Sequence, residues 1–151
     1  MKEVIRLTVV LTVVCVLAGL SLSYVSDATE EARAYQDRLE LLSSLNMVLP
    51  EHDNEPDSDA VIIDDVTYYI SKKDGKINGI AFATSSDKGY SGAIRVMMGI
   101  TPEGEIITIK ILEQKETPGL GTKITEDWFI DQYKGKSLNN ARWAVKKEGG
   151  D

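Results

Sequence analysis

The longest apolar stretch of the chain lies close to its N-terminus. Residues 7–25 carry no charge, and about 20 such residues cross the hydrocarbon core of a bilayer. Lys2 and Arg6 precede this stretch, and Asp27 begins a series of acidic residues after it. The positive-inside rule therefore places the N-terminus in the cytoplasm and the following domain on the extracytoplasmic side. We predict a single-pass inner-membrane anchor over residues 1–26, with residues 7–25 in contact with lipid.

A cleaved signal peptide is the alternative for this segment, because a basic start also fits one. Residues 23–28, SYVSDA, make a poor small-residue cleavage site. Cys15 lies in the middle of the apolar stretch, where it does not fit a lipoprotein signal. These features favour a retained anchor, and both alternatives place the domain on the same side of the membrane.

Helical spacing continues beyond the apolar stretch. Apolar residues recur at steps of three, four and seven with charged residues between them, namely Ala28, Ala32, Tyr35, Leu39, Leu42 and Leu49. This pattern predicts an amphipathic stalk helix from about residue 27 to 47, within a segment 27–50 that Pro50 ends. Two interpretations stay open: the stalk packs on its own domain, or it docks on a partner subunit.

After an acidic loop at residues 51–60, the pattern becomes typical of strands. Residues 66–70 are β-branched or aromatic, and a turn at 73–76 leads to a returning strand at 77–84. A second pair of strands, 93–100 and 105–113, flanks a turn at 101–104. Hairpins imply an antiparallel sheet.

The C-terminal part predicts a short helix and one more strand. The helix covers Glu126–Tyr133, with Thr125 as N-cap and Gly135 at its end, and residues 143–145 form the strand. The fold class is therefore α+β: a transmembrane helix continuing into an amphipathic helix, then an antiparallel-rich sheet with short helices in a domain at 51–151.

Charge and composition exclude several functions. The net charge is −7, and without residues 1–26 the chain has 15 basic and 23 acidic residues. Such an acidic domain binds nucleic acid poorly, because its negative charge repels the phosphate backbone. His52 and Cys15 are the only residues of their types, so no Cys/His metal site and no internal disulfide can form. No hydrolytic triad or phosphate-binding loop is present, and we expect no catalytic side chains in this chain.

Two glycine-containing segments are candidates for ligand binding. In residues 116–123, ETPGLGTK, Pro118 and Gly119 fit the central positions of a type II turn. Glycines on both sides of Leu120 leave backbone N–H groups open to a flat ligand, and Lys123 can meet an anionic oxygen. Residues 89–92, GYSG, lie between two expected strands; Tyr90 can stack on a ring and Ser91 can bond an oxygen. Each segment also fits an ordinary turn or strand connection.

These segments resemble a known family when they are taken together. GYSGAIRVMMGI at 89–100, ILEQKETPGLGTKI at 111–124 and WFIDQYKGKSL at 128–138 are similar to the G subunit of the Rnf electron-transport complex. The C subunit of the sodium-translocating NADH:quinone oxidoreductase is related to it. The resemblance extends over nearly the whole chain, including the anchor.

The resemblance implies a flavoprotein. In the family the domain carries FMN, bound through a phosphoester to a threonine, and relays electrons between subunits of an ion-translocating complex that couples ferredoxin oxidation and NAD reduction to Na⁺ or H⁺ movement. The partners are the other subunits of that complex. The ring contacts implied for this chain are Glu116, Thr117, Gly119, Leu120 and Gly121, with Tyr90 and Ser91 close to the flavin.

The sequence departs from the family at the attachment motif. The last threonine is Thr125, and the [ST]-G-A-T-x-[ST]-like motif is absent, so we expect a chain truncated before it. Residues 91–94, SGAI, match the motif only in part, because Ile94 replaces the threonine. The alternative function is a flavin-free, membrane-tethered assembly or ligand-binding module.

The missing threonine leads to a first prediction. We expect the 151-residue chain, expressed alone, to be colourless or to release its FMN on acid precipitation, because the motif's hydroxyl is not available for the ester. The flavin absorbance of the washed precipitate measures this. Absorbance that stays with the protein would contradict the prediction.

Overall fold

The computed structural model describes residues 1–144, 147 and 149, and the chain divides into two compact units, Met1–Glu40 and Leu41–Asp151. Helix α1 (Lys2–Val48) runs through the first unit and ends in the second. The amide of Leu49 still donates to the carbonyl of Leu45 at 2.8 Å, so the helix stops immediately before Pro50. The predicted continuity of the apolar and amphipathic segments, and their end at Pro50, are confirmed.

The N-terminal part of α1 has the composition of a membrane span. Among the described residues, α1 is the helix that is long and apolar enough to cross a bilayer, with a mean hydropathy of 2.3 over its most apolar window. The hydroxyls of Thr8, Thr12 and Ser21 donate to carbonyl groups four residues earlier at 2.8–2.9 Å. These polar groups are thus satisfied inside the helix, as a hydrocarbon environment requires. The boundaries of the three segments, 1–26, 27–50 and 51–151, stay a prediction.

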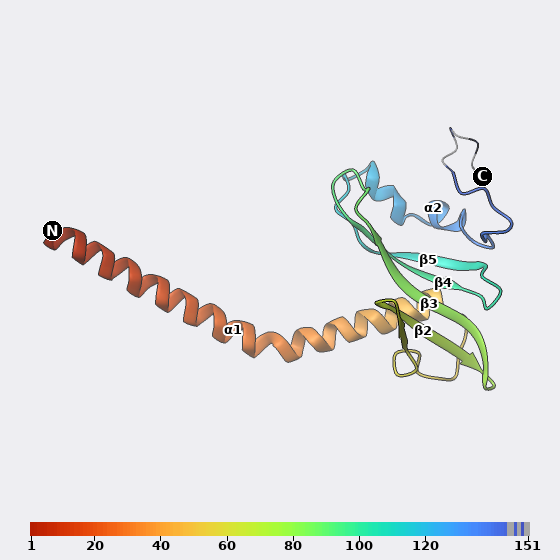
Figure 1. Ribbon diagram of the computed structural model, residues 1–151, viewed down its shortest axis with the longest axis horizontal. Helices are drawn as coiled ribbons and strands as arrows, with labels where there is room; N and C mark the ends of the chain where they lie inside the picture. Colours follow the sequence, from red (N-terminus) through yellow and green to blue (C-terminus); the bar gives the residue numbers. More distant parts are fainter. Residues whose placement is uncertain (145–146, 148, 150–151) are drawn as a thin grey trace. The chain divides into compact units, whose positions relative to one another are not determined.

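The second unit is built on one antiparallel sheet (Figure 1). Its five strands lie side by side in chain order: β1 (Val61–Ile63), β2 (Val66–Lys73), β3 (Lys76–Ser86), β4 (Ile94–Ile100) and β5 (Ile106–Glu113). The four strands expected from the sequence are all present with small shifts of their ends. Strand β1 was not expected, because three apolar residues are too short for a periodic pattern.

The last two turns of α1 close one face of the sheet. Leu45, Val48 and Leu49 form the buried core together with Ala81 of β3 and Met97 of β4. The ammonium group of Lys110 on β5 donates to the Ser44 hydroxyl at 3.0 Å. The last turns of the predicted amphipathic stalk therefore pack on the chain's own domain.

Two glycines allow the helix end to approach the sheet closely. A Cβ atom at Gly99 would lie 1.9 Å from the carbonyl oxygen of Val48, and one at Gly79 would lie 2.6 Å from Cδ of Pro50. The contact at Gly99 involves backbone on the helix side, so no side-chain rotation relieves it. Glycine at this position is therefore a condition for closing the core.

Two short helices follow the sheet: η1 (Gly121–Thr125), a 3₁₀-helix, and α2 (Asp127–Asp131). Figure 1 shows α2 alongside β5, and the last turns of α1 near β3 on the other side of the sheet. The amide of Ile106 donates to Lys136, and the amide of Gly135 donates to Ile106, both at 2.8 Å. These bonds fasten the chain after α2 to β5.

Several details of the C-terminal prediction are wrong. Thr125 is not the N-cap of α2; it is the last residue of η1, and its hydroxyl donates to the Thr122 carbonyl at 2.9 Å. Glu126 occupies the cap position, and its side chain makes no capping hydrogen bond. The helix ends at Asp131, before Gly135. Trp143 and Ala144 are not in a strand, and Val145 lies outside the described residues.

Substituting Gly99 tests the close packing of α1 on the sheet. We expect Gly99→Ala to lower the free energy of unfolding by about 3 kcal/mol, because the new methyl group overlaps the Val48 carbonyl and the core must open. Urea unfolding of the chain in detergent micelles, followed by near-ultraviolet circular dichroism, measures the loss. Ser85→Ala, at an exposed position on β3, is the control and should change stability by less than about 0.5 kcal/mol. Equal midpoints for the two variants would contradict the packing.

Candidate functional site

The two candidate ligand-binding segments start at the same end of the sheet. Ser86, the last residue of β3, pairs with Ile94, and Arg95 pairs with Glu113, the last residue of β5. The β3–β4 connection and the segment after β5 therefore leave the sheet side by side. We call residues 89–92 the first loop and residues 116–123 the second loop.

The second loop contains the predicted turn. Gly119 has φ +76°, the positive value that a type II turn requires after Pro118. The carbonyl oxygen of Thr117 accepts bonds from the amides of Leu120, Gly121 and Thr122 at 3.0–3.3 Å. The amide of Gly119 donates to the Thr122 hydroxyl at 3.0 Å. The turn is thus held from both of its ends.

The carboxylate of Glu116 connects the two loops. Its Oε1 atom accepts a hydrogen bond from the backbone amide of Ser91 at 3.2 Å. Cβ atoms at Gly89 and Gly121 would lie 2.7 Å from Oε1 and 2.8 Å from Oε2. The carboxylate consequently lies between one glycine of each loop.

The remaining predicted residues face solvent. The side chain of Tyr90 is 91% exposed and that of Leu120 is 73% exposed, and Thr117 and Lys123 are also exposed. The structure therefore brings Ser91, Glu116 and Gly121 together, and it leaves Tyr90, Thr117, Leu120 and Lys123 at the surface around them. Which of these residues contact a cofactor stays a prediction.

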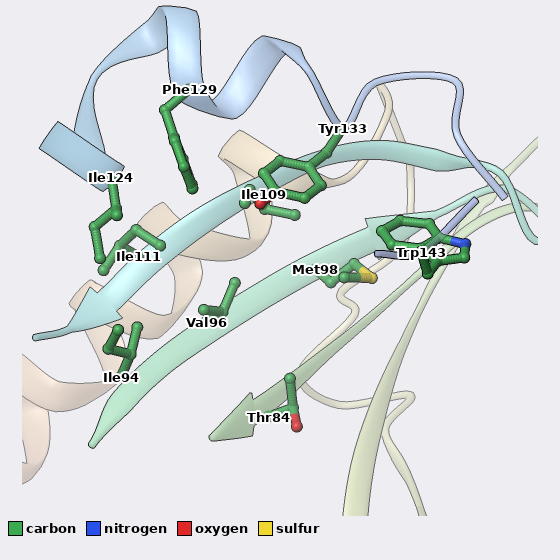
Figure 2. Close-up of a pocket in the computed structure, with 10 residues that line it drawn as sticks. All are labelled: Thr84, Ile94, Val96, Met98, Ile109, Ile111, Ile124, Phe129, Tyr133 and Trp143. Carbon is green, nitrogen blue, oxygen red and sulfur yellow. The ribbon is translucent and has the colours of Figure 1, made fainter. Parts of the chain in front are cut away.

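An apolar cavity of about 290 Å³ is lined in part by Ile94 and Ile124, which follow shortly after the first and second loops in the chain (Figure 2). It lies on the face of the sheet away from α1, where alternate residues of β3, β4 and β5 form its floor. Phe129 and Tyr133 point toward this floor from the α2 side in Figure 2. The lining residues are Thr84, Ile94, Val96, Met98, Ile109, Ile111, Ile124, Phe129, Tyr133 and Trp143.

Aromatic rings form one wall of this apolar cavity. The ring centroids of Phe129 and Tyr133 are 5.5 Å apart with an edge contact, and those of Tyr133 and Trp143 are 6.4 Å apart and nearly parallel. Burial raises the pKa of the Tyr133 phenol above its usual value of 10.0. The wall is therefore a low-polarity surface suited to a flat ring system.

A second opening of about 400 Å³ continues along the same sheet face. It shares Met98 and Trp143 with the apolar cavity, and Phe82, Ile100 and Leu138 add to its walls. The face away from α1 is thus apolar over a large part of its area.

The lining of the site is mostly apolar. Thr84, Tyr133 and Trp143 are the polar side chains among the lining residues of the apolar cavity. Among the described residues, no group of three or more His, Cys, Asp or Glu side chains is placed to hold a metal ion. The apolar cavity offers a low-polarity space for a flat ligand. The backbone of the two loops, which we call the rim, offers polar groups near it.

Comparison with known proteins identifies the family. Residues 89–150, which include both loops, match the FMN-binding domain. The chain is 37% identical over 147 residues to the G subunit of the ion-translocating oxidoreductase complex of Cereibacter sphaeroides, covering 89% of this chain and 66% of that protein. The G subunit from Vibrio vulnificus is 33% identical over 153 residues, covering 91% of this chain and 72% of the relative. The chain belongs to the family of G subunits of ion-translocating oxidoreductase complexes.

Membership of this family confirms the resemblance predicted from the loops and helices. The matching family model is that of an FMN-binding domain, so FMN is the cofactor of this domain, and the relatives are named as subunits of ion-translocating oxidoreductase complexes. Together with the apolar helix, this makes the chain a membrane protein. The chain spans 66% of the length of the relative from Cereibacter sphaeroides.

The apolar cavity and the contact of Glu116 with the two loop glycines were not predicted from the sequence. The signal for the cavity is present in the alternation of apolar residues along β4 and β5, but alternation does not tell which sheet face stays open. Gly89 and Gly121 carry no signal of contact with Glu116, since that contact depends on how two distant loops meet.

The raised pKa of Tyr133 predicts its behaviour at high pH. The neutral phenol is favoured in the folded state, so its stabilising contribution is present below the unfolded pKa near 10 and is lost as pH rises through the folded pKa. In an ultraviolet phenolate titration, Tyr133→Phe should therefore remove one late-titrating tyrosine of six. Tyr69, whose pKa burial and Asp57 also raise, should still titrate late. A titration curve whose late part keeps its full amplitude in the variant would contradict the burial of Tyr133.

Proposed function

We propose that this chain is a membrane-anchored flavoprotein subunit that relays electrons within an ion-translocating ferredoxin:NAD oxidoreductase complex. One observation carries the proposal: in the part that matches the FMN-binding domain, two loops connected by Glu116 lie beside an open apolar cavity. The family name of the relatives supplies the complex.

The residues present fit the ring system of FMN. The apolar cavity has the low polarity and aromatic wall that a flat ring system requires, and its volume of about 290 Å³ lies near the lower end of ligand pockets. Cβ positions at Gly92 and Gly119 meet nothing within 4 Å, so a ligand can approach the loop backbone at these points. The cavity thus suits the ring system. In this proposal the loops contact the polar edge of the ring and the part of FMN that carries the phosphate.

Each part of the site has a role in this proposal. Phe129, Tyr133 and the strand residues bind the ring and exclude water from it. Leu120 covers the ring from the second loop, Tyr90 and Ser91 lie near its polar edge, and Lys123 attracts the phosphate. FMN supplies one-electron and two-electron redox chemistry when bound. The chain orients it and sets its electrostatic surroundings.

The anchor fixes where this chemistry takes place. With the N-terminus in the cytoplasm, the domain lies on the extracytoplasmic side, and the membrane helix and the stalk are available to the other subunits. The stalk residues Tyr35 and Leu39 are exposed, which supports the interpretation that this helix docks on a partner subunit. No side chain of this chain needs to act as an acid or a base.

Filling the apolar cavity tests the proposal. We expect the chain in detergent micelles to bind added FMN reversibly, and Val96→Phe to weaken binding at least about tenfold, because the larger side chain occupies the space of the ring. Quenching of flavin fluorescence on titration with protein gives the dissociation constant.

Val61→Phe is the matched control, since the same change on the exposed strand β1 leaves the apolar cavity intact. Its affinity for FMN should equal that of the parent chain. Absence of FMN binding by the parent would overturn the proposal in favour of a flavin-free tethered module. Equal weakening by both variants would place the flavin elsewhere.

A further inference from the structure

We propose that Glu116 is a positioning residue that holds the two loops together as one preformed rim, and that it acts through the loop backbone and not by contact with the flavin. This inference rests on the proposed function for the identity of the ligand. It rests on the geometry of the described residues for the connection itself, which exists without any ligand.

The hydrogen bond to Ser91 is the first support for this role. Ser91 is exposed, and its amide donates to Oε1 of Glu116 at 3.2 Å. An exposed loop amide otherwise exchanges freely with water. The two residues are separated by 25 positions in the chain, so their bond fixes one loop relative to the other.

The absence of side chains at Gly89 and Gly121 is the second support. A Cβ atom at Gly121 would lie 2.5 Å from Cβ, 2.8 Å from Oε2 and 3.1 Å from Cγ of Glu116. Those three atoms are the nearest heavy atoms to this Cβ position, so glycine at position 121 keeps open space that Glu116 occupies. At Gly89 the same carboxylate is the second-nearest neighbour, at 2.7 Å.

The backbone of Glu116 is itself fixed, which is the third support. Its amide donates to the side-chain oxygen of Gln114 at 2.7 Å. Thr117, the next residue, holds the turn of the second loop through its carbonyl oxygen. The carboxylate therefore extends from a defined point toward the first loop.

A preformed rim favours binding by lowering its entropic penalty. Two separate loops would lose conformational freedom when a flat ligand orders them, whereas loops already joined lose less. The carboxylate is engaged with the Ser91 amide and lies close to one glycine of each loop. Removing it should accordingly loosen the loops before it affects any contact with a ligand.

The test compares four variants and one control variant of the full chain in detergent micelles. Glu116→Ala removes the carboxylate, Glu116→Asp shortens it by one methylene group, and Glu116→Gln keeps an acceptor oxygen at the same reach. Gly121→Ala keeps the carboxylate but takes its space. Glu113→Ala is the control, because Glu113 is exposed three residues before the second loop and its carboxylate lies 3.8 Å from the Lys115 ammonium.

Two readouts separate the connection from flavin binding. Hydrogen exchange of the Ser91 amide, measured by NMR without flavin, reports the connection. Titration with FMN reports the consequence. We expect exchange to rise and FMN affinity to fall by roughly tenfold in Glu116→Ala, Glu116→Asp and Gly121→Ala, with Glu116→Gln close to the parent and Glu113→Ala unchanged.

Unchanged Ser91 exchange in Glu116→Ala and Gly121→Ala would overturn the connection. Faster exchange with unchanged FMN affinity would overturn its role in positioning the rim. If the parent chain shows protected Ser91 but binds no FMN, the proposed function fails while the connection stands. A Glu116→Gln variant as weak as Glu116→Ala, with Ser91 still protected, would instead show that the charge acts directly on the flavin and would overturn the inference.

Discussion

The domain depends on one constraint: its antiparallel sheet is apolar on both faces, and the end of α1 closes only one of them. That closure requires backbone against backbone at Gly99 and Val48, where any side chain would overlap the helix carbonyl. Leu45, Val48 and Leu49 pack on this face. The opposite face is covered in part by α2 and the short segments around it. The apolar cavity is a direct result of this division, because α2 reaches the side of β5 and leaves part of the floor open.

The same sheet places the loops beside the apolar cavity. Antiparallel pairing brings the last residues of β3 and β5 to the same end of the sheet. The match to the FMN-binding domain begins at Gly89, in the β3–β4 connection at this end. A low-polarity slot next to a polar backbone rim suits a cofactor with a flat apolar body and a charged tail. The protein then contributes binding, exclusion of water and electrostatics, while the redox chemistry belongs to FMN.

Much of this architecture could be predicted from the sequence. Alternating β-branched residues predicted four of the five strands, and Pro50 predicted the end of α1. The Pro118–Gly119 pair predicted a turn with positive φ at Gly119. Strand β1 was missed because three residues carry no period, and the N-cap was assigned to Thr125 because sequence rules do not distinguish a cap from the end of a preceding 3₁₀-helix. The contact of Glu116 with Ser91 joins residues 25 positions apart, and no local pattern contains it. The family itself came from the resemblance of whole segments, and curated relatives confirm it.

The most direct test of the central claim is to map FMN on the domain by NMR. FMN is added to the isotope-labelled chain in detergent micelles, and the shifts of backbone amide signals are recorded residue by residue. The account predicts shifts in both loops, in β4 and β5 along the apolar cavity, and around Phe129 and Tyr133, with β1 and the first residues of β2 unaffected. Shifts confined to β1 and β2, or no shifts at FMN concentrations well above those of the protein, would contradict it.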